Sequence, residues 1–412
     1  MKILLIHNKY QQPGGEDAVF KSESDLLSRH GHTVEHMIYD NSNIKTLADK
    51  WLSGIRTIYN PASAREIQRK IEQFGPNLIH VHNFVPLVSP SVLFVANKNN
   101  IPVVITLHNY RLICPSATLF HNHKIYEKSI HSIFPWDAVF KGVYRNSIIQ
   151  TAAVALMTAW HNIIGTWRNK VDLYITLTQF AKEKFRNSAL SIPEDKLTVK
   201  PNFVMNTGPG AATRQNFFLF VGRLTDEKGI RTLLNAAKLH DFKLVIIGDG
   251  PLRHLVEDFA RTNTNLHYLG FQNKDTVLHH LKTCKALIFP SIWYEGFPMT
   301  ILEAFSVGTL VLASKLGGMA EIIQHGVNGM HFEGGNAQDL VTKIIEISKQ
   351  PERVKYMSGN ARLTYLEQYT PERNYTMLAA IYESAIANKL QTQERLTIDR
   401  ISETPCASIL SR

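Results

Sequence analysis

The sequence predicts an α/β protein of two successive units, each with a parallel sheet covered by helices on both faces. The chain has 412 residues, which is ample for two hydrophobic cores. Short apolar runs alternate with helical segments, as parallel sheets require. The alternation stops at residues 207–215, where Gly208, Pro209 and Gly210 lie among small polar residues typical of a linker, and then starts again.

In the first unit, we predict strands wherever short apolar runs lie between turn residues. These strands cover residues 2–7, 33–39, 78–82, 103–107, 173–178 and 197–200. Helices are expected at 18–30, where Gly31 ends the first one, and at 179–188. Residues 41–73 are polar and mostly helical in pattern. Residues 110–170 hold many aromatic residues and histidines and break the alternation, so we expect an elaborated helical insert there.

The second unit repeats the pattern after the linker. Its predicted strands cover residues 217–221, 244–247, 267–269, 286–289 and 310–313. Helices are expected over residues 337–349 and 353–367, and a last helix over about 371–388. The remaining residues, 391–412, read as a polar tail.

The net charge of +10 favours anionic partners such as nucleotides or anionic lipid. The chain has no lysine- and arginine-rich run and no RNA-binding or zinc-finger motif, so we expect no nucleic acid partner. Three cysteines, Cys114, Cys284 and Cys406, lie far apart, which argues against a disulfide framework or a cysteine metal site. Residues 1–7 are too short for a signal peptide, so a reducing cytoplasm is the expected location.

The most informative stretch runs from Glu295 to Glu303. It follows the predicted strand 286–289, Gly296 permits a sharp turn, and Pro298 suits the first position of a helix. The free N–H groups at a helix start favour an anion, which two neighbouring carboxylates would repel. A ligand that carries hydroxyl groups as well as phosphate resolves this conflict, because carboxylates accept hydrogen bonds from hydroxyl groups.

A nucleotide-sugar has this chemistry. Its diphosphate would lie at the helix start formed by Phe297, Pro298 and Met299. Its ribose would bind one of the two glutamates, and its sugar would bind the other.

This stretch resembles the Glu-x7-Glu signature of retaining glycosyltransferases with two facing Rossmann-like domains, the GT-B fold, and it looks most like family 4 of these enzymes. The resemblance implies that Glu303 binds the donor ribose and that Glu295 is a catalytic residue beside the sugar. For such a motif alone, an ordinary helix with two surface glutamates is the alternative. The motifs upstream favour the enzyme.

A second motif, from Gly222 to Gly229, follows the predicted strand 217–221. Arginine can hold phosphate oxygens with two N–H groups, and lysine adds a point charge. The motif matches the family pattern Gly-Arg-x4-Lys-Gly. The resemblance therefore implies that Arg223 and Lys228 bind the donor diphosphate and stabilise the charge of the leaving group.

Two further strand ends belong to the predicted donor site. Gly248 ends the strand 244–247, and Phe271 follows the strand 267–269. The resemblance implies that both positions line the nucleotide cleft and contact the base. A core strand followed by a turn is the alternative at each.

The first unit contributes two motifs. Gly14 and Gly15 follow the first strand and permit positive φ and a close backbone approach, and similar family members carry this pair near the donor phosphate and the acceptor. His108 ends the strand 103–107 and looks like the active-site histidine of the family, whose usual next residue is aspartate. Here Asn109 takes that place, which leaves open whether a charged group tunes His108. A structural hydrogen-bonding role for His108 is the alternative.

No strand end carries the paired aspartates of metal-dependent glycosyltransferases, so we expect no catalytic metal. His80 and His82 share one strand face, and His121 and His123 have the same spacing. A metal site needs a third ligand of fixed geometry. We therefore interpret His80 and His82 as packing or cleft-wall residues.

The resemblance implies an N-terminal acceptor domain over residues 1–205, with the insert at about 110–170, and a C-terminal donor domain over residues 206–370. The last helix, residues 371–390, would cross back to the N-terminal domain, and residues 391–412 would form the tail.

The implied activity is metal-independent, retaining transfer of a sugar from a nucleotide-diphosphate sugar, with UDP or GDP as nucleotide and no other cofactor. The acceptor would be a glycan or a lipid-linked sugar. Similar family members often build bacterial surface polysaccharides such as capsule, O-antigen or exopolysaccharide. A sugar-nucleotide epimerase of the same fold and a non-catalytic nucleotide-binding scaffold at a membrane are the alternatives.

The insert suggests where the enzyme works. It interleaves aromatic and basic residues, which suit a lipid headgroup region: Phe134, Trp136, Phe140, Tyr144, Trp160 and Trp167 with Lys141, Arg145 and Arg168. Polar residues interrupt its apolar stretch, so it is a poor membrane span. We expect peripheral contact with an anionic membrane at its inner, cytoplasmic face. The alternative is that these aromatic residues fill the N-terminal core.

Overall fold

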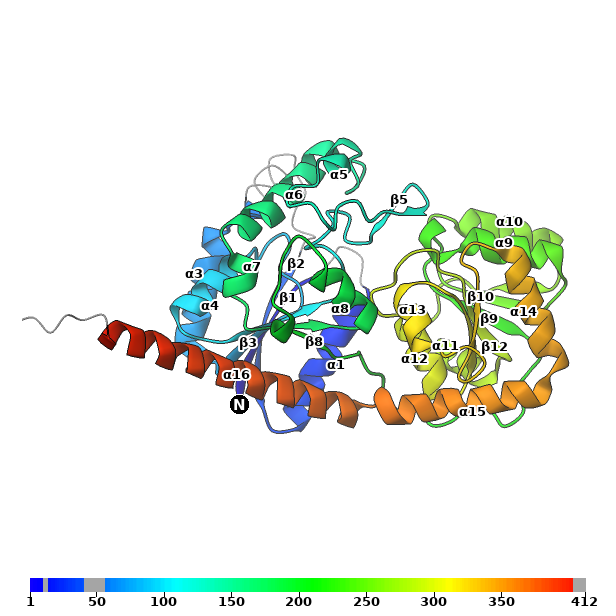
Figure 1. The fold of residues 1–412 in the computed structure, drawn as a ribbon. Coiled ribbons are helices and arrows are strands. Elements are labelled where there is room, and N and C mark those ends of the chain that lie inside the picture. Colours follow the sequence, from blue (N-terminus) through cyan, green and yellow to red (C-terminus); the bar gives the residue numbers. More distant parts are fainter. Residues whose placement is uncertain (10–13, 41–55, 403–412) are drawn as a thin grey trace, which may run out of the picture.

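The computed structural model describes residues 1–9, 14–40 and 56–402, with side chains as far as residue 392. The chain forms two α/β units side by side (Figure 1). Each unit has a six-stranded parallel sheet, which confirms the predicted fold class. Parts of the predicted helical region and of the polar tail, residues 41–55 and 403–412, lie outside the described residues.

The first sheet has the strand order β2-β1-β3-β4-β7-β8. Its strands are β1 (Lys2–Lys9), β2 (Thr33–Asp40), β3 (Leu78–Val81), β4 (Val103–Leu107), β7 (Leu173–Thr176) and β8 (Leu197–Val199). Neighbouring residues of a strand point to opposite faces, so Ile3 and Leu5 pack on one face and Leu4 and Ile6 on the other. Burial on both faces explains why these strands read as continuous apolar runs.

Helices cover both faces of the first sheet. The face of Leu4 packs against α3 (Pro61–Phe74), α4 (Ser91–Lys98), α6 (Ile148–Ile163), α7 (Thr166–Asn169) and α8 (Gln179–Arg186). The face of Ile3 packs against α1 (Gly15–Arg29) and the last helix, α16 (Pro371–Ser402).

The insert at residues 110–170 is only partly helical. It begins with irregular chain and a small antiparallel hairpin of β5 (Phe120–His121) and β6 (Lys124–Ile125), followed by α5 (Trp136–Phe140), α6 and α7. We did not predict the hairpin, because two residues per strand carry no readable alternation. In the described part of the chain, no helix combines the length and the apolar composition needed to cross a membrane.

The second sheet has the strand order β11-β10-β9-β12-β13-β14. Its strands are β9 (Phe218–Val221), β10 (Leu244–Ile247), β11 (Leu266–Tyr268), β12 (Ala286–Phe289), β13 (Leu310–Ser314) and β14 (Met330–Phe332). Only β14 was not predicted, since it has three residues at the sheet edge. One face packs against α9 (Ile230–Leu239), α10 (Arg253–Thr262) and α14 (Ala337–Lys349). The other packs against α11 (Lys274–Thr283), α12 (Met299–Ser306), α13 (Gly317–Ile322) and α15 (Pro351–Gln368).

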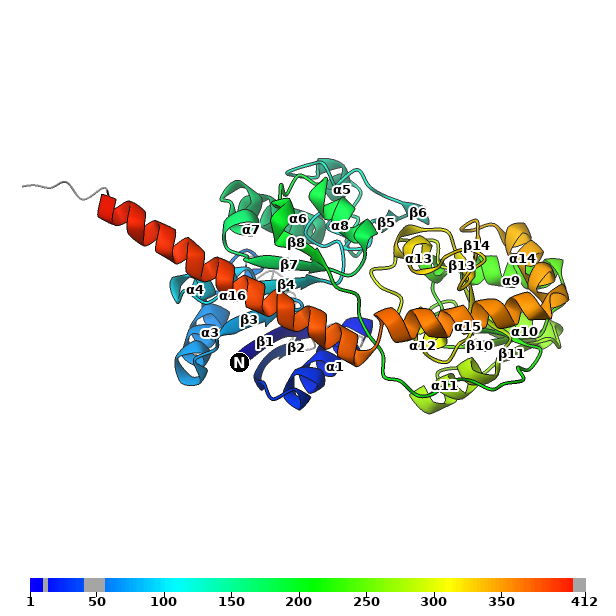
Figure 2. The ribbon, with the colours of Figure 1, turned by 60° about the horizontal axis from the view of Figure 1, so that its bottom comes forward.

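The last two helices connect the units. Figure 2 shows α15 against the second unit and α16, which follows it end to end, crossing the first. Leu378, Ile381 and Tyr382 of α16 are buried in the core beside β1 and β4. The predicted helix end near residue 388 was wrong, because α16 continues to Ser402 and so includes the first part of the predicted tail.

Candidate active site

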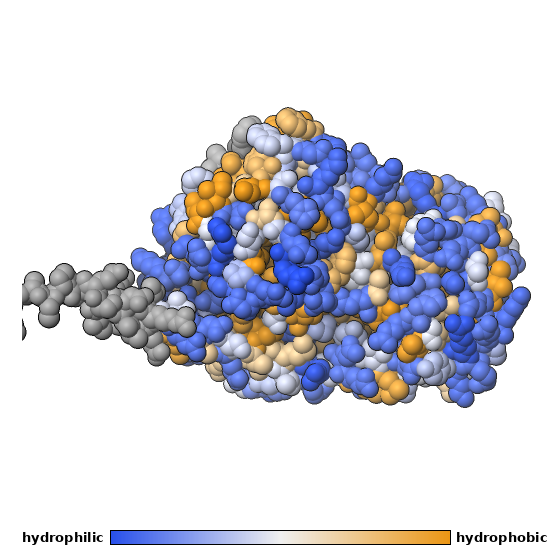
Figure 3. Space-filling model, viewed as in Figure 1, coloured by the Kyte–Doolittle hydropathy of each residue, from blue (hydrophilic) through white to orange (hydrophobic). Residues whose placement is uncertain are grey.

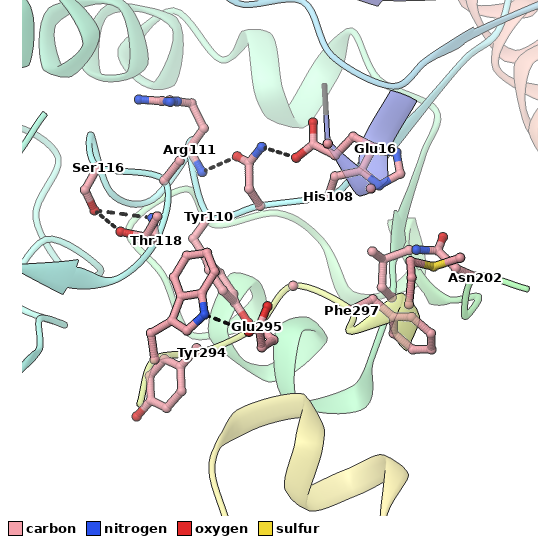
Figure 4. Close-up of a pocket in the computed structure, with 18 of the residues that line it drawn as sticks. Glu16, His108, Tyr110, Arg111, Ser116, Thr118, Asn202, Tyr294, Glu295 and Phe297 are labelled. Atoms are coloured by element: carbon pink, nitrogen blue, oxygen red, sulfur yellow. Dashed lines mark hydrogen bonds between the residues drawn. The ribbon is translucent and has the colours of Figure 1, made fainter. Parts of the chain in front are cut away.

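The strand order of each sheet reverses at one place. In the first sheet, β1 lies between β2 and β3, and in the second, β9 lies between β10 and β12. Open α/β sheets bind ligands in the crevice beyond the carboxyl ends of strands at such a point. A cavity of about 500 Å³ lies where the loops after β1 and β4 meet the loops after β9 and β12 (Figure 4). Seven predicted site residues line it: Gly14, Gly15, His108, Arg223, Glu295, Phe297 and Met299.

The two units touch beside this cavity. A Cβ atom at Gly296 would lie 2.3 Å from the backbone oxygen of His108, so any side chain there would push the units apart. Gly296 does not have a positive φ. The chain nevertheless bends at Gly296, as predicted, and the close contact with His108 is a second reason why a glycine is needed there.

Glu295 is held by three donors. Its Oε1 accepts hydrogen bonds from Ser291 Oγ at 2.6 Å, Trp293 Nε1 at 2.8 Å and Lys228 Nζ at 2.8 Å. The Lys228 ammonium also lies 3.0 Å from Oε2. The carboxylate is nearly buried, so this ion pair neutralises it beside the start of α12. The pairing with Lys228 therefore reduces the repulsion between Glu295 and a bound anion that the sequence analysis describes.

Two residues predicted to bind the diphosphate line neither of the cavities described in this section. Lys228 is engaged by Glu295, at the end of a short 3-10 helix, Asp226–Lys228. Pro298, predicted as the first helical residue of this segment, is the N-cap of α12, which begins at Met299. The role of both as diphosphate ligands stays a prediction.

A second cavity of about 900 Å³ lies beyond the carboxyl ends of β9 and β10. Gly248, Phe271 and Glu303 line it, and Arg223 lines both cavities. Gly248 has a φ of +147°, and a Cβ there would meet the Gly222 oxygen at 1.8 Å, so only glycine fits. The Phe271 ring is 81% exposed, which leaves its face open to stack on a planar group. Burial raises the pKa of the Glu303 carboxyl.

A buried chain of polar groups lies behind His108. Its Nε2 is 3.0 Å from His82 Nδ1, His82 Nε2 is 3.4 Å from Glu23 Oε2, and Glu23 Oε1 pairs with Lys200. His82 Nε2 and Glu23 Oε2 form no hydrogen bond with each other, but the negative charge of Glu23 favours the His82 tautomer with its proton on Nε2. His82 Nδ1 then accepts the Nε2–H of His108. This arrangement leaves His108 Nδ1 as a hydrogen-bond acceptor.

The charge state of His108 follows from its surroundings. Burial lowers the pKa of His108 to about 3, although Glu23 opposes this shift. His108 is therefore neutral near pH 7 and offers a hydrogen bond rather than a positive charge. The charged group behind His108 is Glu23, which lies on the far side of His82. The sequence, with Asn109 in place of the usual aspartate of the family, did not indicate this group.

His80 is part of the same buried region. Its Nδ1 lies 2.7 Å from Tyr382 Oη of α16, and its Nε2 lies 2.8 Å from Thr106 Oγ1. His80, His82 and Glu23 have the side chains and spacing of a metal site. However, both ring nitrogens of His80 have protein partners, and Glu23 is paired with a lysine. The group therefore fits a hydrogen-bonded core better than a cation site.

Glu16 is a cavity residue that we did not predict as part of the site. Its Oε1 accepts a hydrogen bond from Asn109 Nδ2 at 3.0 Å, and its buried Oε2 has no partner within residues 1–9, 14–40 and 56–402. Burial raises the pKa of Glu16 to about 7, against the lowering effects of Asn109 and Arg111. The sequence signal that could have revealed it is a carboxylate directly after the predicted glycine pair.

The two glycines of the first loop do not use the positive φ that glycine permits. Gly14 is extended, with a φ of −135°, and Gly15 also lacks a positive φ. A Cβ at Gly15 would make an ordinary 3.7 Å contact with Met299 Cγ. The two glycines therefore leave space in the cavity wall rather than supplying a left-handed turn.

Comparison with known proteins agrees with this geometry. The family model described as Glycosyltransferase Family 4 matches residues 26–205, and the one described as Glycosyl transferases group 1 matches residues 207–364. O-antigen chain mannosyltransferase C of Escherichia coli is 28% identical over 42% of this chain and 48% of its own. HepE of Anabaena, solved in complex with UDP, has a TM-score of 0.65 at 17% identity, covering 93% of this chain and 100% of that one.

One match extends over nearly the whole of both proteins. An uncharacterized glycosyltransferase of Methanocaldococcus jannaschii is 30% identical, covering 94% of this chain and 99% of its own. With its two facing parallel sheets and the cavity between them, this chain belongs to the family 4-type glycosyltransferases of the GT-B fold.

Proposed function

We propose that this glycosyltransferase transfers a sugar from a nucleotide-diphosphate sugar to a glycan or lipid-linked acceptor, with retention of configuration and without a metal or other cofactor. The observation that carries the proposal is a pair of cavities that share Arg223 in their walls. The larger one offers Phe271 to a base and Glu303 to a ribose. The smaller one offers His108 and the neutralised Glu295 to a sugar.

The residues divide the chemistry between them. Arg223 and the N–H groups at the start of α12 would hold the diphosphate and stabilise its charge as it leaves. Glu295 would accept hydrogen bonds from sugar hydroxyl groups, and the neutral His108 would position the sugar without repelling a developing positive charge. In retaining transfer, the acceptor hydroxyl attacks from the face that the diphosphate leaves.

A transfer assay tests the proposed activity. We expect free nucleoside diphosphate to be released from one UDP- or GDP-sugar only when an acceptor is present, and the product bond to keep the donor configuration by NMR. At a hundred times its Kd, the same donor should add about 2.7 kcal/mol to the free energy of unfolding. EDTA should leave the rate unchanged. An inverted product, conversion of the sugar without an acceptor, or loss with EDTA and rescue by Mn²⁺ would contradict the proposal.

We further propose that the enzyme acts at the cytoplasmic face of a bacterial membrane, in the synthesis of a surface polysaccharide. The similarity to O-antigen chain mannosyltransferase C supports the second part. An exposed apolar face of α5, α6 and their flanks supports the first, and Figure 3 shows hydrophobic residues gathered over α6. Its members are between 42% and 72% exposed: Ile133, Trp136, Phe140, Ile148, Ile149, Leu156, Trp160, Ile163 and Ile164.

The details of this apolar face refine the sequence prediction. Trp167 is fully buried in the first core, so the alternative interpretation holds for that residue. Trp136, Phe140 and Trp160 are exposed, as membrane contact requires. Arg145, between α5 and α6, also lines the smaller cavity, so one insert carries the apolar face and part of the wall of the cavity in which we place the transfer. A lipid-linked acceptor would use both.

Flotation with liposomes tests membrane binding. We expect binding to anionic vesicles at low salt and weaker binding to neutral vesicles or at high salt, because each basic residue near the surface adds about 1 kcal/mol. Phe140→Glu with Ile163→Glu should lower anionic binding at least 10-fold. Tyr356→Glu, which changes a similarly exposed aromatic residue of α15, is the matched control and should bind normally. Binding that ignores lipid charge and salt, or no binding, would contradict the proposal.

A further inference from the structure

Glu16 is held rigidly at the edge of the smaller cavity. It lies in the first turn of α1, whose start is fixed by Asp17. Asp17 Oδ2 accepts the backbone N–H of Gly14 at 2.9 Å, and Asp17 Oδ1 lies 2.9 Å from His7 Nε2. Because both ends of this turn are anchored, the position of the Glu16 carboxyl is set before any ligand binds.

Asn109 determines which oxygen of Glu16 is free. The backbone N–H of Arg111 donates to Asn109 Oδ1 at 3.0 Å, so the amide must turn its NH₂ group toward Glu16 (Figure 4). Asn109 Nδ2 then donates to Glu16 Oε1 at 3.0 Å. Among the residues that the structure describes, the buried Glu16 Oε2 has no hydrogen-bond partner, which is costly for a carboxylate unless a ligand supplies a donor.

We propose that Glu16 binds the attacking hydroxyl group of the acceptor and accepts its proton during transfer. This inference rests on the proposed function. The acceptor O–H proton moves to Glu16 Oε2, and the oxygen electron pair forms the bond to the anomeric carbon of the donor. The bond from that carbon to the diphosphate oxygen breaks, and its electron pair leaves with the nucleoside diphosphate. Glu16 then releases the proton to water.

The charges around Glu16 suit this task. Burial is the largest influence on the pKa of Glu16 and raises it to about 7. Arg111, on the loop after β4, lowers this pKa, and Asp17, on the same helix, raises it. A carboxylate with a pKa near 7 is a stronger base than an ordinary glutamate and is still half ionised at neutral pH. Asn109 donates a hydrogen bond to Glu16 and carries no charge. An aspartate at this position would place a second carboxylate beside Glu16.

Glu16→Gln tests the proposal, because the amide can keep the hydrogen bond to Asn109 while it loses the ability to accept a proton. We expect kcat to fall at least 100-fold, with the affinity for the donor unchanged by calorimetry. In the wild type, kcat should rise with pH through an inflection near 7, which Glu16→Gln should lack. Asn109→Asp should move this inflection to higher pH, because a second carboxylate disfavours ionisation of Glu16.

Asp25→Asn, which changes an exposed acidic residue of the same helix, is the matched control and should behave like the wild type. If the wild type transfers sugar and Glu16→Gln retains full kcat and the inflection, the role of Glu16 is refuted while the proposed function stands. If the wild type transfers no sugar from any nucleotide-sugar, the proposed function itself fails. A Glu16→Gln protein that has lost donor affinity would show that Glu16 supports the fold of the site, which also contradicts the proposal.

Discussion

Lys200→Met is expected to lower the free energy of unfolding by about 3–5 kcal/mol, because it leaves the Glu23 carboxylate buried without its cation. Both side chains are fully buried, and Lys200 Nζ also lies 3.3 Å from Asn374 Oδ1 of α16. Burial would raise the pKa of Glu23, but Lys200, with help from His80, brings it below its ordinary value. The stabilisation by this depressed pKa is present above the ordinary glutamate range and is lost as pH falls through the folded-state value.

Urea unfolding measures this effect, and the chain offers a matched control. Lys70 pairs with Glu35 at 2.7 Å across the surface, with both side chains partly exposed, so Lys70→Met should change the free energy of unfolding by less than about 1 kcal/mol. Adding Glu23→Gln to Lys200→Met should recover part of the loss, because it removes the unpaired charge. Equal, small effects of Lys200→Met and Lys70→Met would show that the buried pair contributes little.

Arg223→Ala and Lys228→Ala are each expected to lower kcat/KM at least 100-fold. Arg223 lines both cavities, so its loss removes a cation from the place proposed for the leaving diphosphate. Lys228 acts through a different contact. Its ammonium bonds both oxygens of Glu295, so its loss frees a carboxylate charge beside the anion site.

The two variants should therefore differ when Glu295 is changed as well. Adding Glu295→Gln should partly rescue donor binding in Lys228→Ala, measured by calorimetry, and should not rescue Arg223→Ala. Arg231→Ala is the control, because Arg231 pairs with Asp226 in an exposed position nearby. If Lys228→Ala keeps wild-type kinetics, the ion pair with Glu295 has no part in catalysis.

The sequence predicts the fold well because strands that are buried on both faces of a sheet appear in it as short continuous apolar runs. Eleven of the twelve strands of the two large sheets were predicted, and β14 and the β5–β6 hairpin, with three and two residues per strand, were too short to read. Helix ends were less accurate, as α16 shows. Its continuation past residue 388 has no distinct signal in a polar sequence.

The candidate site was predictable only where residues cluster along the chain. The Glu295–Glu303 stretch and the motif with Arg223 are local, and both line the cavities. The chain of groups behind His108 could not be predicted, because Lys200 lies 177 residues from its partner Glu23. The free oxygen of Glu16 likewise depends on a hydrogen bond between the first turn of α1 and the loop after β4, which no spacing in the sequence reveals.

The position of α16 has a consequence for biosynthesis. Leu378, Ile381 and Tyr382 complete the core of a unit whose strands come from the first half of the chain. During translation, β1 to β8 and α1 emerge long before this helix, so the part of the apolar sheet face that α1 does not cover stays exposed while the second unit is made. Units of a multidomain chain generally fold in the order of synthesis. Here the unit that emerges first is completed last, because α16 must emerge from the ribosome before the first core can close.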